Sequence, residues 1–204
     1  MTEDEARDWV RQRFGVSRET VLARFSNLVA VHAKLQNLIA PSTLPHLWSR
    51  HIVDSAQLLD LCGERDGLWI DVGSGAGFPG LITAMLSDRP TLLIEPRRKR
   101  AEFLNAAVAE LKCANIEIAQ AKAEHVPPQQ AQVISARAVS SATALLQSAV
   151  HLADGRTEWL LPKGRGAQTE VDQARQSWHG AFHVEQSITQ SDSYIIVASG
   201  VSPR

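Results

Sequence analysis

Apolar side chains recur every three or four positions through the first third of the chain, a spacing that predicts helices rather than strands. Three helices are predicted, over residues 3–14, 18–39 and 44–62, and Pro41 separates the second from the third. No short or alternating apolar run falls among them. We therefore expect residues 1–66 to form an N-terminal helical cap.

From residue 67 onward, short apolar runs alternate with helical stretches. Strands are predicted over residues 68–72, 91–95, 116–119, 132–135, 158–161, 182–186 and 194–198, and helices over 81–86, 99–111 and 139–152. Strands that alternate with helices form parallel sheets with both faces covered. The last two strands are too close in sequence for a crossover helix and should pair antiparallel. Residues 67–204 are thus predicted to form one α/β domain with a mostly parallel, Rossmann-like sheet.

The first of these strands ends in a glycine-rich turn, DVGSGAGFPG over residues 71–80. Without Cβ atoms the main chain can pass close to a ligand, and positive φ angles cost little. Gly75-x-Gly77-x-x-Gly80 matches the dinucleotide-binding fingerprint, and Glu95 lies twenty residues after Gly75, where a ribose-binding acid is expected. A dinucleotide-binding protein, either an oxidoreductase or a silent binder, is one interpretation of this turn.

Asp71 favours a different cofactor. A carboxylate directly under the turn is unfavourable beside a pyrophosphate but suits a cation, and S-adenosylmethionine carries an ammonium and a sulfonium charge. In this interpretation Asp71 and Gly75 belong to the site of the amino-acid end, while Glu95 binds the ribose hydroxyls. The antiparallel pair at the end of the sheet is also typical of Rossmann-like methyltransferases. We therefore favour S-adenosylmethionine as the cofactor.

Composition and charge set further limits. The 21 Lys and Arg residues face 22 Asp and Glu residues, so there is no overall basic field of the kind that accompanies many nucleic-acid binders. Cys62 and Cys113 lack metal-type spacing and predict free thiols in a reducing compartment. Neither a secretory signal nor a run of about twenty apolar residues is seen. We expect a cytoplasmic protein that makes no membrane contact.

Five segments together resemble one family. They are the turn with its Phe-Pro-Gly ending, RHIVDS at 50–55, EPRRKR at 95–100, ISARA at 134–138 and PKG at 162–164. In this combination the chain resembles the RsmG (GidB) family of ribosomal small-subunit RNA guanine-N7 methyltransferases. The resemblance implies an S-adenosylmethionine-dependent methyltransferase fold. It also implies methyl transfer to N7 of a guanine in the 530 loop of 16S rRNA, with the rRNA or the small subunit as partner.

The resemblance also implies a set of cofactor-binding residues. Carried over position by position, they are Gly73, Phe78, Ala123, Glu124 and Arg137. Because N7 of guanine has a free lone pair and no proton to remove, the reaction needs no general base. We accordingly assign no catalytic residue and expect rate enhancement from positioning.

Local basic clusters are the candidates for RNA binding. Arg97, Arg98, Lys99 and Arg100 stand together, and Lys163 and Arg165 flank Gly164. Cations at a helix N-terminus are slightly disfavoured, so phosphate binding would explain the first cluster, with a solvated helix turn as the alternative.

His51 and Asp54 are three residues apart and should share a helix face. Without a third ligand nearby we expect no metal site there, and we predict instead that Asp54 holds the His51 ring. We expect a monomer.

Overall fold

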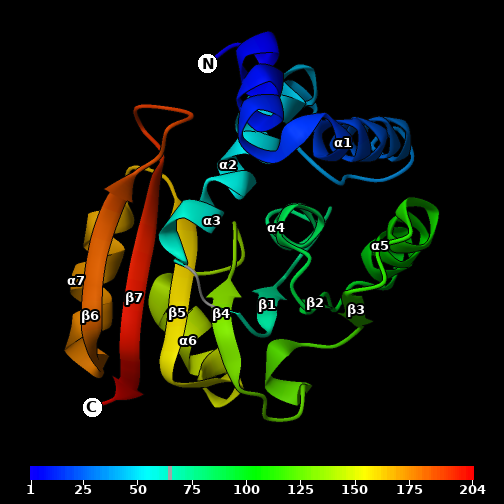
Figure 1. The fold of residues 1–204 in the computed structure, drawn as a ribbon. Coiled ribbons are helices and arrows are strands. Elements are labelled where there is room, and N and C mark those ends of the chain that lie inside the picture. Colours follow the sequence, from blue (N-terminus) through cyan, green and yellow to red (C-terminus); the bar gives the residue numbers. More distant parts are fainter. Residues whose placement is uncertain (64–65) are drawn as a thin grey trace.

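A seven-stranded sheet forms the middle layer of the computed structural model, which describes residues 1–63 and 66–204 (Figure 1). The strand order is β3-β2-β1-β4-β5-β7-β6. The neighbouring strands from β3 to β5 pair in parallel. β7 is antiparallel to β6, as predicted, and it is also antiparallel to β5. The strands are β1 Trp69–Val72, β2 Thr91–Ile94, β3 Ile116–Ala119, β4 Ala131–Ser135, β5 Ala153–Lys163, β6 Trp178–Gln186 and β7 Tyr194–Pro203.

Helices cover both faces of this sheet. The N-terminal helices pack with α4 and α5 in one hydrophobic core, while α6 and α7 share a second core with the opposite sheet face (Figure 1). The helical segments are α1 Glu3–His32, η1 Pro41–His46, η2 Trp48–Ile52, α2 Val53–Ala56, α3 Leu58–Leu61, α4 Gly80–Ser87, α5 Arg98–Leu111, η3 Ala123–His125, α6 Ala142–Ala149, η4 Val150–Leu152 and α7 Ala167–Ser177. Within the described ranges, no helix is long and apolar enough to cross a bilayer.

The first two predicted helices form α1, which breaks at Gly15, where φ is 85° and ψ is 164°. The prediction that the second helix reaches residue 39 is wrong, because α1 ends at His32. The apolar pattern continues through Leu35 to Leu38, but Leu35 is 77% exposed, and Leu38 is buried from outside the helix. Residues 33–40 instead form turns.

The third predicted helix is helical but irregular, with 3-10, π and α segments in succession over residues 41–61. Glu3 stabilises its π segment, because its carboxylate accepts hydrogen bonds from the backbone N–H groups of Trp48 and Ser49, each at 2.9 Å. The predicted boundary near residue 66 adjoins residues 64 and 65, which lie outside the described residues.

Two helical segments were not predicted, the 3-10 helix η3 and the α-helix α7. α7 lies between β5 and β6 and buries Ala167, Val171 and Ala174. These positions have helical spacing, but two of them are alanines and give only a weak apolar signal.

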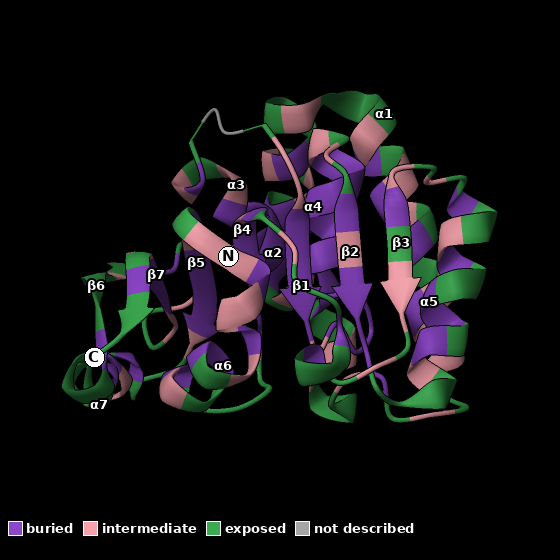
Figure 2. Ribbon diagram, turned by 90° about the horizontal axis from the view of Figure 1, so that it is seen from below, coloured by how far each residue is buried: buried purple, intermediate pink, exposed green. Residues whose placement is uncertain are grey.

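Side chains alternate between the two faces of the central strands, which are buried (Figure 2). Ile70 and Val72 belong to the core beneath α6 and α7. Trp69 belongs to the opposite face, under α3, in a third cluster with Leu58. Asp71 is two residues after Trp69 on the same strand, so both side chains point to the same face of the sheet. The Asp71 carboxylate therefore lies on the side covered by the N-terminal helices.

Candidate functional site

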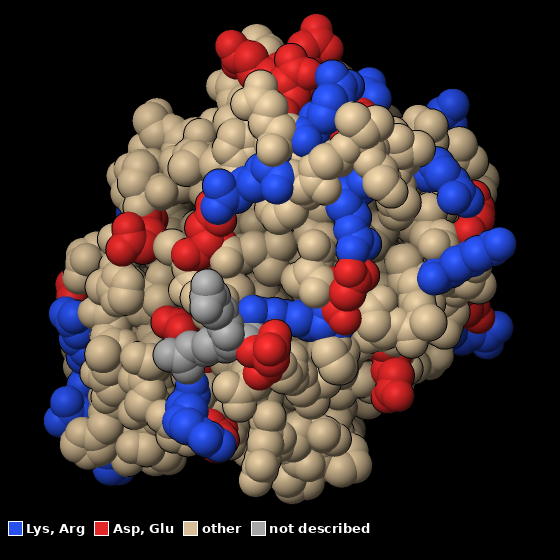
Figure 3. All heavy atoms as spheres, in the orientation of Figure 1, with Lys and Arg blue, Asp and Glu red and all other residues tan. Residues whose placement is uncertain are grey.

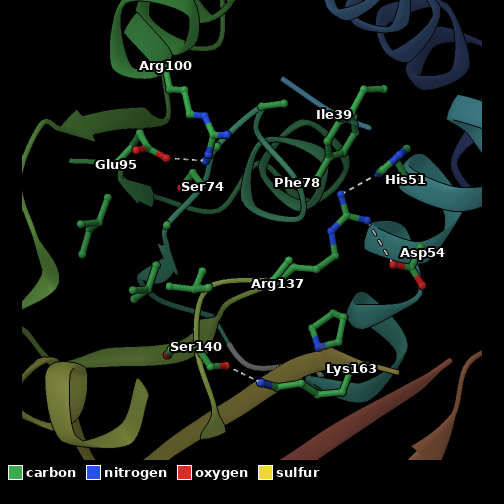
Figure 4. Close-up of a pocket in the computed structure, with 18 of the residues that line it drawn as sticks. Ile39, His51, Asp54, Ser74, Phe78, Glu95, Arg100, Arg137, Ser140 and Lys163 are labelled. Carbon is green, nitrogen blue, oxygen red and sulfur yellow. Dashed lines mark hydrogen bonds and ion pairs between the residues drawn. The ribbon is translucent and has the colours of Figure 1, made fainter. Parts of the chain in front are cut away.

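A cavity of about 1050 Å³ opens at the carboxyl ends of the parallel strands, where α/β sheets bind their ligands. Figure 4 shows part of its wall. Among the predicted site residues, those that line it are Gly73, Gly75, Phe78, Glu95, Arg97, Arg100, Ala123, Glu124, Arg137 and Lys163. Asp71, Arg98, Lys99 and Arg165 do not.

The four glycines of the turn divide into two pairs. Gly77 and Gly80 permit close packing: a Cβ at Gly80 would stand 2.4 Å from Cβ of Asp71, so α4 lies directly against β1. Gly73 and Gly75 line the cavity with φ angles of 72° and 57°. A Cβ at Gly75 would meet no atom closer than 3.6 Å and would occupy cavity space. A Cβ at Gly73 would instead lie 2.5 Å from Val139 Cγ2, another side chain that lines the cavity, so Gly75 is the glycine of the turn that a ligand can approach most closely.

Glu95 is fixed to this turn. Its side chain is buried, and its carboxylate accepts one hydrogen bond from the Gly75 N–H at 2.9 Å and another from the Arg97 N–H at 2.8 Å. Each oxygen thus has one backbone donor and keeps lone-pair capacity for another. The twenty-residue spacing read from the sequence corresponds to a direct contact between Glu95 and Gly75.

Asp71 lies beneath the turn, fully buried. The indole N–H of Trp69 donates to Ser135 Oγ at 2.8 Å, and the Ser135 hydroxyl donates to Asp71 Oδ1 at 2.6 Å. The other carboxylate oxygen of Asp71, Oδ2, has no hydrogen-bond partner among the described residues. Burial raises the pKa of the Asp71 carboxyl, and the hydrogen bond from Ser135 opposes that shift. Asp71 is separated from the cavity by the turn itself.

Arg137 follows β4 and extends across the cavity toward the helical segment (Figure 4). Nη1 donates to Asp54 Oδ2 at 3.2 Å, and Nη2 donates to His51 Nδ1 at 2.8 Å. The guanidinium also lies 5.1 Å from the centre of the Phe78 ring. Two segments that are far from Arg137 in sequence, one with His51 and Asp54 and one with Phe78, therefore fix this cation, whose side chain remains 17% exposed.

These contacts determine the state of His51. Because Nδ1 accepts from Arg137, the ring proton lies on Nε2 and is donated to Thr43 Oγ1 at 2.9 Å. Burial, with the charges of Arg137 and Arg50, lowers the pKa of His51 to about 3. The prediction that Asp54 holds the His51 ring is wrong, because Arg137 lies between them and binds both.

Asp54 organises a polar cluster that sequence reasoning missed. Its Oδ1 atom accepts hydrogen bonds from Gln57 Nε2 at 3.0 Å and from the hydroxyls of Ser187 and Thr189 at 3.3 Å each. The loop between β6 and β7 is thereby joined to the helical segment and, through Asp54, to Arg137. Ser187 and Thr189 are more than 130 positions from Asp54 in the sequence, so no local sequence pattern could reveal these contacts.

The predicted RNA-binding cations have different surroundings. Arg98 is exposed and paired with Glu102, and Arg165 is exposed and paired with Asp192. Arg100 is partly buried and donates to the Asn37 carbonyl at 3.2 Å. On the face drawn in Figure 3, Lys and Arg are interspersed with Asp and Glu rather than gathered into one field.

Lys163 lies inside the cavity, not on the outer surface. Its ammonium contacts Glu170 Oε2 at 2.8 Å and the Ser140 carbonyl at 2.7 Å, and its side chain is only 11% exposed. Across residues 1–63 and 66–204, no cluster of three or more His, Cys, Asp or Glu residues could hold a metal ion.

The cavity suits S-adenosylmethionine in size and in chemistry. A ligand pocket of this type commonly measures roughly 300–1,000 Å³. Glu95 offers oriented carboxylate oxygens, which match vicinal hydroxyls, and Gly75 leaves open the space that a Cβ would fill. Arg137 supplies a cation that suits a carboxylate. The donors and acceptors present are those that a nucleoside with an amino-acid tail requires.

Fold and site together define a Rossmann-like, S-adenosylmethionine-dependent methyltransferase. A solved methyltransferase of this class from Aquifex aeolicus superposes with a TM-score of 0.60 at 15% identity, covering 81% of this chain and 96% of that one. The family model for rRNA small subunit methyltransferase G, GidB, matches residues 18–194, so the chain belongs to that family. The dinucleotide-binding alternative is set aside.

Two relatives have the same family name. The ribosomal RNA small subunit methyltransferase G of Sphingopyxis alaskensis is 46% identical, with 99% of this chain and 88% of that protein covered. The protein of that name from Zymomonas mobilis is 42% identical, with 100% and 96% covered.

Proposed function

We propose that this enzyme transfers the methyl group of S-adenosylmethionine to N7 of a guanine in the 530 loop of 16S rRNA. Family membership supports the RNA substrate. The observation that carries the N7 assignment is membership of this family, and the state of His51 and Asp54 agrees with it. His51 is neutral with both ring nitrogens engaged. Asp54 is occupied by Arg137, Gln57 and two hydroxyls. Neither is free to act as a general base, and N7 of guanine needs none.

The cofactor residues have separate roles in this proposal. Glu95 would bind the ribose hydroxyls, and Ala123 with Glu124 would face the adenine. Gly73, Gly75 and Phe78 would form the floor and wall near the amino-acid end, whose carboxylate would pair with Arg137. Asp71, beneath the turn, would act on that end through the packing of β1 against α4 rather than by contact.

S-adenosylmethionine supplies an electrophilic methyl group. The chain's own contribution is to hold cofactor and base in line and to exclude water, which can account for a large part of a methyl-transfer rate. Arg137 is fixed by His51, Asp54 and Phe78 before any ligand binds. That rigidity limits the entropy lost when the reactants are aligned.

The RNA surface is proposed from the exposed cations at the cavity rim. Arg97 and Arg100 line the cavity, Arg98 and Lys99 follow on the exposed start of α5, and Arg165 lies beyond β5. Residues 1–66 would act as a cap, because they supply part of the cavity wall from Leu38 to Asp54, and residues 67–204 as the catalytic domain. We further propose a cytoplasmic monomer that acts on the rRNA or on the small subunit.

The test is direct. The protein is incubated with radiolabelled S-adenosylmethionine and either undermethylated small subunits or naked 16S rRNA, and N7 methylation is mapped by chemical strand cleavage. We expect label at one guanine of the 530 loop. Label at another base, or no incorporation into either substrate, would contradict the proposal.

A further inference from the structure

The end of the cavity away from Glu95 contains a partly buried ion pair that the cofactor assignment does not use. Lys163 and Glu170 both line the cavity, with side chains 11% and 25% exposed, and their charged atoms are 2.8 Å apart. Lys163 is the last residue of β5, and Glu170 is in the first turn of α7. Burying an ion pair costs desolvation free energy, so its presence in a ligand cavity calls for an explanation beyond stability.

Lys163 and Glu170 can each form a further hydrogen bond. The Lys163 ammonium has three donors, of which one is given to the Ser140 carbonyl at 2.7 Å and one to Glu170. Glu170 Oε2 also accepts from the Ala142 N–H at 2.6 Å. Within the described part of the chain, Glu170 Oε1 has no hydrogen-bond partner. One donor of Lys163 and the Oε1 acceptor of Glu170 therefore remain without a partner among the described residues, on two side chains that both line the cavity.

The pair is too far from Glu95 to belong to the same subsite. β2, which precedes Glu95, and β5, which ends at Lys163, are separated by β1 and β4 in the sheet. Three strand spacings amount to roughly 14 Å. Figure 4 shows Glu95 and Lys163 on opposite sides of the cavity, with Arg137 between them. This end is available for a second reactant.

A guanine edge matches that donor and acceptor. Guanine has O6, an acceptor, next to N1–H, a donor, whereas adenine has the reverse order at the same two positions. Enzymes that modify a single base read this Watson–Crick edge by hydrogen bonds after the base leaves the stack. Contacts to N1–H and O6 leave the N7 lone pair unprotonated and unpaired.

We propose that Glu170 and Lys163 select the acceptor base, an inference that rests on the proposed function. Glu170 Oε1 accepts a hydrogen bond from guanine N1–H, and the free N–H of the Lys163 ammonium donates a hydrogen bond to guanine O6. Ser140 and the start of α6 hold the two side chains in place through the Ser140 carbonyl and the Ala142 N–H. In this proposal the two residues determine which base is accepted, and they take no part in forming the bond between the methyl group and N7.

The test compares guanosine with 2,6-diaminopurine riboside at the methylated position of ligated 16S rRNA reconstituted into small subunits. Diaminopurine keeps N7, but its N1 atom is an acceptor and its group at C6 is a donor, the reverse of guanine. Glu170→Gln retains the shape of the side chain and can present either a donor or an acceptor. The matched control is Asp172→Asn, on the same helix, whose carboxylate is 61% exposed. For each protein kcat/KM is measured with both RNAs, together with S-adenosylhomocysteine affinity and Tm.

We expect the wild type and Asp172→Asn to prefer guanosine strongly, and Glu170→Gln to lose about tenfold or more of that preference with cofactor affinity unchanged. An unchanged preference ratio, with both rates lowered together, would overturn the inference and assign the pair a structural role. If Glu170→Gln lowers Tm sharply, Lys163→Gln provides the same comparison at the O6 donor. A wild type that methylates neither RNA would contradict the proposed function itself, which is a separate outcome.

Discussion

Arg137 donates a hydrogen bond from Nη2 to Nδ1 of His51 over 2.8 Å, although the two residues are 86 positions apart. The contact requires a neutral His51, because a protonated ring would present a second donor to the guanidinium. It joins the residues that follow β4 to the irregular helix of the N-terminal segment, at the edge of the cavity.

Arg137→Lys should weaken cofactor binding. Lysine keeps the charge but not the planar set of donors that contacts His51 and Asp54 together. We expect the Kd for S-adenosylhomocysteine, measured by titration calorimetry, to rise about tenfold or more. Arg165→Lys changes an exposed arginine that does not line the cavity and serves as the control. Wild-type affinity in Arg137→Lys would remove Arg137 from the cofactor site.

Glu95→Gln tests the carboxylate that joins the turn to β2. The amide directs an NH₂ group at one of the two backbone N–H donors, of Gly75 or of Arg97, so one buried hydrogen bond is lost. We expect urea unfolding to show a loss of about 1–3 kcal/mol, and S-adenosylhomocysteine to bind roughly tenfold more weakly. Glu102→Gln, at a solvated position on α5, should change neither quantity. Retained affinity in Glu95→Gln would argue against ribose binding by Glu95.

Gly80→Ala should destabilise the fold by steric overlap. The new Cβ would stand 2.4 Å from Asp71 Cβ and 2.6 Å from Leu93 Cδ2, so α4 must move away from β1. Overpacking of this kind costs about 1–3 kcal/mol. Gly155→Ala places a methyl group where nothing lies within 4 Å and should change the free energy of unfolding by less than about 0.5 kcal/mol. Equal stability of the two variants would show that the close packing of α4 on β1 is not required.

His51 should make stability depend on pH. Its pKa is about 3 in the folded state and near the ordinary 6.5 in the unfolded chain. Between these two pKa values only the unfolded state takes up the proton. The contribution of His51 to the free energy of unfolding is therefore complete above about pH 6.5. It declines as pH falls, by up to about 1.4 kcal/mol per pH unit.

The measurement is urea unfolding at pH 7 and pH 5. We expect the loss of stability between them to be smaller in His51→Gln than in the wild type by about 2 kcal/mol. His46→Gln, at an exposed position, should behave as the wild type does. The same pH dependence in all three proteins would contradict a buried, neutral His51.

The pattern of the sequence predicts the parts of the fold that depend on neighbouring residues. The alternation of short apolar runs with helical stretches predicts the parallel strands, and the short link before residue 194 predicts the antiparallel end. The helix over Ala167–Ser177 was missed because its buried face is made largely of alanine. The irregular helix over residues 41–61 was predicted as regular, because the Glu3 carboxylate that bonds the N–H groups of its π segment comes from the far end of the helical cap.

By itself the sequence determined the glycine turn and the acid twenty residues beyond it, because a strand, its turn and the next strand end are held together by local geometry and parallel pairing. Tertiary structure alone decided which glycines pack and which face the cavity, and that Arg137 lies between His51 and Asp54. It also decided that Lys163 faces Glu170 inside the cavity. These contacts form between side chains from different elements, and their distances depend on how the elements pack, which no local periodicity encodes.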